Sequence, residues 1–161
     1  MSGARFNDVV GRITYPMFVV TAADGDERSG CLVGFATQSS IRPPRFLVFL
    51  SKVNHTYGVA RRAGVLAVHV LSAGDRDLAE LFGSETGDDV DKFARCRWHA
   101  GPEGVPVIDG LDWFCGRVVG RFDGGDHEGF LLDPTAAGLR EDDARPLDYQ
   151  AVKDMTPGHP A

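Results

Sequence analysis

Six runs of apolar residues, separated by turn and loop residues, have the composition of β-strands. They are rich in β-branched and aromatic side chains and lie at residues 16–22, 29–37, 45–51, 66–71, 113–122 and 128–132. Such residues favour strands, and an Asp-Gly pair at Asp24-Gly25 is typical of the turn between two hairpin strands. The run at 45–51 is apolar on both faces, as the central strand of a sheet is. The pattern therefore predicts a protein built mainly from short strands.

Two short helices are predicted between these strands. The first covers residues 56–63, and either Asn54 or Thr56 can act as its N-cap. The second covers residues 75–82, which carry apolar side chains at helical spacing. Most gaps between strands are too short for the helical crossovers of a doubly wound parallel sheet. We therefore expect a mainly β fold, a small antiparallel barrel with short helices at its periphery.

The chain of 161 residues has the size of one domain. From residue 139 onward it carries charges and prolines with few aliphatic side chains. Such a segment cannot offset its ordering entropy by burial, so we predict a barrel domain over residues 1–138 and an acidic, proline-containing tail over residues 139–161, free or lying on a partner. Residues 83–91 are rich in glycine and acidic residues and are predicted to form a mobile loop.

Charge and composition narrow the classes of function. The net charge of −6 disfavours binding to a phosphate backbone, so no nucleic-acid partner is expected. No apolar run reaches the roughly 20 residues that cross a membrane, and the N-terminus lacks the apolar stretch of a signal peptide. Three cysteines without a C-x-x-C pair fit a reducing compartment, so we expect a cytoplasmic protein. His99 has no companions at ligand spacing, and no metal site is expected.

Two polar clusters at neighbouring strand ends are candidates for a ligand-binding site. Residues 37–40 (TQSS) and residues 51–56 (SKVNHT) flank the same Pro43-Pro44 connection, so they should lie close together. The second cluster starts a predicted helix, where free backbone N–H groups suit a phosphate, and Lys52 adds a full positive charge. The first could meet the edge of a planar heterocycle. Each cluster alone is better explained by an ordinary polar loop or a capped turn, but together they predict a site for a flat anionic ligand.

Two histidines have different interpretations. His127 lies on a glycine-rich bend and is either a catalytic candidate or a solvated turn residue. His69 lies inside an apolar run and is expected to be a hydrogen-bonded core or interface residue. The sequence has no G-x-S-x-G, P-loop or G-x-G-x-x-G pattern. No motif therefore supports a hydrolase or a Rossmann-fold protein.

Three segments taken together resemble the flavin reductase family, which has the FMN-binding split-barrel fold, antiparallel and Greek-key-like. They are GCLVGFATQSSIRPPRFLVFLSKVNHTY, GVLAVHVLSAGDRDLAELFG and GDHEGF, and the resemblance extends over residues 13–137. It implies a homodimer that binds FMN, or FAD in its place, at the subunit interface. It also implies hydride transfer from NADH or NADPH to the flavin, and delivery of reduced flavin to a partner monooxygenase.

The resemblance also assigns residues to the site. His127 matches the histidine near the nicotinamide, and hydride passes directly between the two rings without a dedicated acid or base. The implied flavin-binding residues are Gly34, Phe35, Ala36, Thr37, Gln38 and Ser39 beside the ring, Ser51, Lys52, Asn54, His55 and Thr56 around the phosphate, and Phe82, Gly83 and Lys92 closing the pocket.

Some positions depart from the family pattern. Leu32 stands in place of a usual Thr, Gly34 in place of Asn and Val53 in place of Ser. These changes leave turnover and the choice of pyridine nucleotide open. Three alternatives therefore remain: an FMN-binding electron carrier or redox sensor without efficient NAD(P)H oxidation, a split barrel similar to pyridoxamine-phosphate oxidase, and a ligand-free structural dimer.

Overall fold

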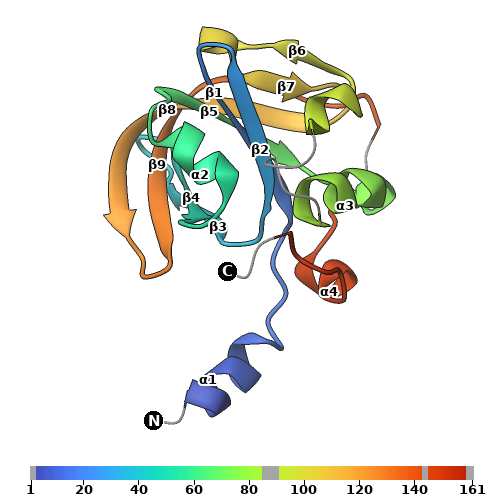
Figure 1. The fold of residues 1–161 in the computed structure, drawn as a ribbon. Helices are drawn as coiled ribbons and strands as arrows, with labels where there is room; N and C mark the ends of the chain where they lie inside the picture. The colour runs from blue at the N-terminus through green and yellow to red at the C-terminus, as the bar shows by residue number, and fades with distance from the viewer. Residues whose placement is uncertain (1–2, 85–90, 143–144, 159–161) are drawn as a thin grey trace.

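The computed structural model describes residues 3–84, 91–142 and 145–158 and is dominated by one antiparallel sheet. Its seven strands run in the order β2-β1-β5-β8-β9-β4-β3. A separate two-stranded sheet pairs β6 with β7 (Figure 1). The strands are β1 (Phe18–Asp24), β2 (Glu27–Val33), β3 (Ala36–Ser40), β4 (Arg45–Ser51), β5 (Val65–Val70), β6 (Trp98–Ala100), β7 (Pro106–Ile108), β8 (Asp112–Asp123) and β9 (His127–Gly138).

The helices are short and lie around the sheet. They are α1 (Gly3–Val10), α2 (His55–Ala60), α3 (Arg76–Ser84) and α4 (Tyr149–Val152), with 3-10 turns η1 (Ala73–Asp75), η2 (Lys92–Ala94) and η3 (Pro102–Gly104). Figure 1 shows α2 on the inside of the curled sheet, whereas α1 stands away from the body of the molecule. Within the described residues, no helix combines the length and the apolar character needed to cross a membrane.

The sheet curls because its inward-facing residues form one apolar core. Phe18 and Val20 of β1, Val48 of β4 and Phe130 of β9 meet inside it, and Val59 of α2 packs against them. On β1 these positions alternate with Val19, which is buried on the opposite face of the sheet, so the period-2 pattern of this strand buries both faces. The predicted mainly β, antiparallel architecture is therefore observed.

A second core lies on the outer face of β1 and includes the C-terminal segment. Leu147 and Val152 are 4% and 5% exposed and pack with Met17, Val19 and Phe82. The Leu147 backbone accepts a hydrogen bond from Met17 N–H (2.9 Å) and donates one to the Leu71 carbonyl (2.8 Å). For the described residues of this segment, the expectation that little is buried is wrong, because two buried apolar residues and several backbone hydrogen bonds offset the ordering entropy. The predicted boundary between a domain and a tail near residue 138 stays a prediction.

The β6–β7 hairpin, which the apolar pattern does not reveal, is fastened to the barrel by two buried polar side chains. The Thr21 hydroxyl donates to the Pro106 carbonyl. His69 is fully buried, with Nδ1 2.9 Å from the Val19 carbonyl and Nε2 2.9 Å from the Ile108 N–H. The ring is thus a donor at Nδ1 and an acceptor at Nε2, and burial lowers its pKa to about 4. The expected core role of His69 is confirmed.

Several element boundaries differ from the predicted ones. The single predicted strand at residues 29–37 is two strands, because the chain turns at Gly34 and Phe35 between β2 and β3. Helix α2 ends at Ala60 rather than residue 63, and α3 with η1 covers residues 73–84 instead of 75–82. The N-terminal helix α1 is not foreseen at all. Most of the predicted acidic loop at residues 83–91 lies outside the described residues.

Candidate functional site

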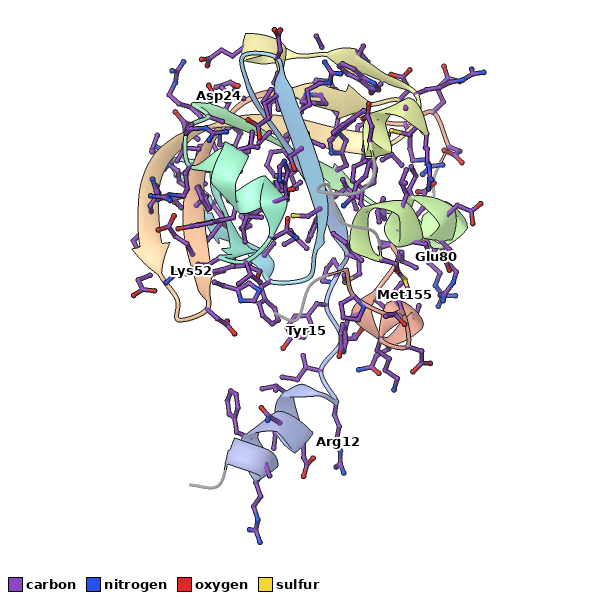
Figure 2. The ribbon with its side chains drawn as sticks, in the orientation of Figure 1. Arg12, Tyr15, Asp24, Lys52, Glu80 and Met155 are labelled. Carbon is purple, nitrogen blue, oxygen red and sulfur yellow. The ribbon has the colours of Figure 1, made fainter. Side chains whose placement is uncertain are left out.

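One pocket brings together several of the predicted residues from distant parts of the chain. Its volume is about 250 Å³, and it lies where the β2–β3 connection, the end of β4, the end of α3 and the C-terminal segment meet. The ring of Tyr15 contacts Phe35 and Tyr149, which line the pocket. Figure 2 labels Tyr15 between Lys52 and Met155, so the pocket can be located from it. The predicted residues that line it are Gly34, Phe35, Ser51, Asn54, Phe82, Gly83 and His127.

The floor of the pocket is apolar and buried. Met17, Leu50 and Phe82 line it and are at most 5% exposed. Cys31 lines it too, and burial raises the pKa of its thiol to about 11. The thiol therefore stays protonated at neutral pH and serves as a small apolar wall residue rather than a nucleophile. Such a floor suits the flat face of an aromatic ring system.

The polar end of the pocket lies where β4 runs into α2. Ser51 is the last residue of β4, and its buried Oγ has no hydrogen-bond partner among the described residues. Asn54 caps α2, with its Oδ1 accepting from the Thr56 N–H at 2.9 Å, which leaves the NH₂ group as the donor of that side chain. A buried hydroxyl without a partner costs about 1–3 kcal/mol, so a polar ligand group at this position would be stabilised.

His127 and Phe35 form the rim of the pocket. Their ring centroids are 5.0 Å apart, and Phe35 is 51% exposed although it is a large apolar residue. His127 Nδ1 lies 2.7 Å from the Asp126 carboxylate, and this bond lowers the pKa of Asp126. Since the ionised carboxylate only accepts, Nδ1 of His127 is the donor and Asp126 orients the ring.

Gly83 is required by close packing at the closed end of the pocket. A Cβ at this position would lie 2.6 Å from Leu32 Cδ2 and 3.4 Å from the Met155 methyl group. Lys92 lies behind this wall rather than in it: Nζ donates to the carbonyls of Gly30 (3.2 Å) and Phe82 (3.1 Å). Lys92 therefore ties β2 to α3, and its contribution to a ligand would be indirect.

The structure does not bring the remaining predicted residues to the pocket wall. Ala36, Thr37, Gln38 and Ser39 follow the rim along β3, and the last three are exposed. Lys52 Nζ pairs with Asp123 of the β8–β9 hairpin at 2.7 Å.

Two predicted phosphate contacts are engaged elsewhere. His55 lies 3.5 Å from Glu27. Thr56 is fully buried, and its hydroxyl lies 2.7 Å from that of Ser29. As the protein stands, Ser51 and Asn54 are therefore the side chains of this cluster that face the pocket.

Sequence reasoning missed the residues that the C-terminal segment contributes. Tyr149, Pro157 and Gly158 all line the pocket, and Gly158 N–H donates to the Gly83 carbonyl at 3.2 Å. A signal was present: Asp148 precedes a short apolar stretch and caps α4, its carboxylate accepting from Ala151 N–H.

No group of three or more His, Cys, Asp or Glu side chains among the described residues is arranged to hold a metal ion.

Residues 10–156 match the model of a protein family, the flavin reductase like domain. The chain therefore belongs to the flavin reductase family, and the resemblance noted in its three segments is confirmed.

Two curated relatives and one solved structure illustrate the relationship. The reductase subunit HsaB of a flavin-dependent monooxygenase from Mycobacterium tuberculosis is 32% identical over 96% of this chain and 86% of its own length. The FMN reductase (NADH) RutF from Methylorubrum extorquens is 29% identical over 80% of this chain, and the match spans 62% of RutF. The NADH:FAD oxidoreductase SgcE6 from Streptomyces globisporus superposes with a TM-score of 0.81 at 26% identity, covering 90% of this chain and 86% of that one. The predicted fold class is thereby confirmed.

Proposed function

We propose that this chain is an NADH-dependent flavin reductase that binds FMN in the pocket between β4, the β2–β3 connection and the C-terminal segment. The observation that carries the proposal is the buried, unpartnered Oγ of Ser51, a residue that lines a pocket with an apolar, buried floor. An apolar floor with one polar end matches a flat ring that carries an anionic chain.

Each part of the pocket has a role in this proposal. The floor formed by Leu50 and Phe82 takes the ring, and Ser51 and the NH₂ group of Asn54 donate to the phosphate end. Lys52 is close enough in the chain to add its charge if its ion pair with Asp123 opens. Thr37, Gln38, His55 and the other predicted residues outside the pocket wall would act only after rearrangement.

A flavin bound over Leu50 and Phe82 would supply the chemistry of hydride acceptance from a reduced nicotinamide. The residues of the chain position the two rings and exclude water, and no nucleophile or general base is needed. His127, held by Asp126 at the rim, is the candidate for contact with the nicotinamide. Its role is to orient the co-substrate rather than to transfer a proton.

The names of the relatives support NADH as the co-substrate and a monooxygenase as the recipient of reduced flavin. RutF is an FMN reductase (NADH), SgcE6 an NADH:FAD oxidoreductase, and HsaB the reductase subunit of a flavin-dependent monooxygenase. We extend these activities to this chain as part of the proposal, with the cytoplasm as its location.

A homodimer is also proposed. Helix α1 buries none of its residues, and Phe6 and Val9 on it are 51% and 63% exposed. A helix of eight residues is not stable alone in water, so it requires a surface to pack on. Ile41, Val119 and Phe122 supply further exposed apolar side chains on the body. A second copy of the chain can cover both sets.

Steady-state kinetics tests the activity. Purified protein is mixed with NADH and increasing FMN, and the loss of NADH absorbance is followed. The proposal predicts oxidation that saturates with FMN. A protein that retains FMN while NADH leaves the flavin oxidised would instead be an electron carrier or redox sensor. A protein that ignores added FMN altogether would contradict the flavin site.

A further inference from the structure

Four aromatic rings form a continuous row along the mouth of the pocket. The centroids of His127 and Phe35 are 5.0 Å apart, those of Phe35 and Tyr15 are 6.0 Å apart, and those of Tyr15 and Tyr149 are 6.0 Å apart. The two contacts of Tyr15 are edge-to-face, at 70° and 77°, which is a favourable geometry for aromatic pairs. Three members of the row, His127, Phe35 and Tyr149, line the pocket itself.

Tyr149 is held in this row before any ligand arrives. Its backbone N–H donates to the Tyr15 carbonyl at 2.7 Å, and the preceding Asp148 forms an antiparallel bridge with Pro16. Two residues earlier, Leu147 is paired on both sides by Met17 and Leu71. The backbone that carries the ring is fixed in this way and the ring packs on Tyr15, so less conformational entropy is lost when the ring contacts a ligand.

The division of the pocket determines which ligand meets the row. The deep floor is apolar and buried, and Ser51, which carries the buried polar group, is the cross-strand partner of His127 at one end of the row, whereas Tyr149 is at the other end. A flavin that fills the floor with its phosphate at Ser51 leaves the Tyr149 end of the row for the second planar ring. Direct hydride transfer requires that this second ring lie against the flavin. The nicotinamide dinucleotide must therefore enter past the aromatic row.

We propose that Tyr149, from the C-terminal segment, contacts the nicotinamide dinucleotide at the mouth of the pocket and sets its affinity without contributing to flavin affinity. The inference rests on the proposed function and deepens it by giving the C-terminal segment a part in co-substrate binding. The ring of Tyr149 offers a rigid apolar surface beside Phe35 and His127, and planar heteroaromatic ligands favour such surfaces.

The test separates the two ligands. FMN affinity is measured by titration, KM for NADH by kinetics, and NAD⁺ binding to the oxidised, FMN-loaded protein by calorimetry, which needs no turnover. Tyr149→Ala is expected to raise KM for NADH and weaken NAD⁺ binding by about tenfold, the usual cost of one lost aromatic stacking contact. Its FMN affinity should stay within about twofold of the wild type. Tyr149→Phe should behave as the wild type.

Two further variants test whether a loss of NADH binding comes from the missing ring of Tyr149 or from a disturbed fold. Tyr57→Ala is the matched control, because Tyr57 packs edge-to-face on Phe130 at 6.2 Å and does not line the pocket. Tyr149→Leu keeps apolar bulk against Tyr15 and replaces the alanine variant if that one unfolds. Unchanged KM for NADH in Tyr149→Ala and Tyr149→Leu, or an equal loss of FMN affinity in them, would overturn the inference. A wild-type protein that holds FMN yet neither binds NAD⁺ nor oxidises NADH would overturn the proposed function, and this inference with it.

Discussion

Ser29 and Ser51 are both buried serines near the start of α2, and they differ in what their hydroxyl groups contact. Ser29 Oγ lies 2.7 Å from Thr56 Oγ1, so both hydroxyls are satisfied inside the protein. Ser51 is 8% exposed, and its Oγ has no partner among the described residues. The first serine stabilises the fold, and we assign the second to the ligand.

Ser51→Ala is therefore expected to separate binding from stability. Removing an unpartnered hydroxyl should leave the free energy of unfolding unchanged or slightly raised, whereas FMN affinity should fall by about 1 kcal/mol, or roughly fivefold. Ser29→Ala is the matched control: it should lower stability by leaving Thr56 unpaired, with little effect on FMN. Titration of FMN and chemical denaturation of both variants check this. Equal FMN affinity in wild type and Ser51→Ala would count against the assignment.

At the residue scale, the sequence revealed the types of side chain but not their partners. The hydroxyl, amide and imidazole groups at the ends of apolar runs led to Ser51, Asn54 and His127, which do line the pocket. Thr56 belongs to the same cluster, but its partner Ser29 is 27 positions away in the chain. Lys52 is paired with a residue 71 positions away. Local patterns cannot show such distant pairing, so they assign too many residues to the ligand.

At the scale of elements, the β4–α2 loop and the β8–β9 hairpin are joined by the ion pair of Lys52 and Asp123. Nζ and Oδ1 are 2.7 Å apart, and the pair raises the pKa of Lys52 and lowers that of Asp123. Both groups are solvent-accessible, so the pair contributes little to stability. Asp123 instead competes with any phosphate that Lys52 could contact.

Asp123→Asn should consequently strengthen FMN binding. The expected gain is about threefold at low ionic strength, and it should shrink as salt is added because both interactions are screened. Asp24→Asn, which removes a surface partner of Arg62, serves as the control and should leave FMN affinity unchanged. A loss of affinity in Asp123→Asn, or no change at any salt concentration, would show that Lys52 does not reach the phosphate.

His69 joins three elements, β5, β1 and β7, and makes the stability of the fold depend on pH. Its folded-state pKa of about 4 lies below the ordinary value of 6.5, so the unfolded chain takes up the proton first as pH falls. The stabilisation is complete above about pH 6.5 and is lost progressively down to about pH 4, on the order of 3 kcal/mol in all.

Denaturation at a series of pH values tests this dependence. The free energy of unfolding should fall less steeply between pH 6.5 and pH 4 in His69→Gln than in the wild type. His99→Gln is the control, because His99 is exposed beside Asp109. Parallel pH profiles for wild type and His69→Gln would contradict the role assigned to the buried ring.

Most strands of the main sheet could be predicted from their composition, because they bury apolar residues in the cores on its two faces. The three-residue strands β6 and β7 could not, since they are shorter than the pattern needs and are fastened by Thr21 and His69 from elsewhere in the chain. The turn at Gly34 and Phe35 was also missed. It divides one apolar run into two strands and creates the rim of the pocket.

At the scale of the whole molecule, α1 stands away from the body and buries none of its residues (Figure 1). The segment that follows α1 is attached to the body by two hydrogen bonds from Gln150 Nε2, to the carbonyls of Gly11 (3.2 Å) and Ile13 (3.1 Å). Phe6 and Val9 lie on one side of the helix and are exposed. The proposed dimer gives these side chains a surface to pack on.

Removing residues 1–12 should weaken self-association by at least about tenfold, because apolar side chains lose their contact surface. The double variant Phe6→Asp, Val9→Asp should have the same effect, whereas Asn7→Asp adds a charge to the same helix and should not. Sedimentation over a range of protein concentrations gives the association state. A truncated chain that associates as tightly as the full chain would exclude α1 from the interface.

The C-terminal segment is where the observed structure differs most from the one predicted from the sequence. A composition of charges and prolines predicted a tail, but Leu147 and Val152 anchor it in the second core, and Tyr149 and Pro157 reach the pocket. Two well-placed apolar residues are enough to hold a segment whose average composition is polar. Composition over a long window cannot detect them.

The central claim is that FMN lies in this pocket with its phosphate at the end of β4. A crystal structure of the protein grown with FMN is the most direct measurement. In that crystal, the flavin ring should lie over Leu50 and Phe82, with a phosphate oxygen within hydrogen-bonding distance of Ser51 Oγ. A flavin bound elsewhere, or bound here with Ser51 Oγ still unpartnered, would contradict the claim.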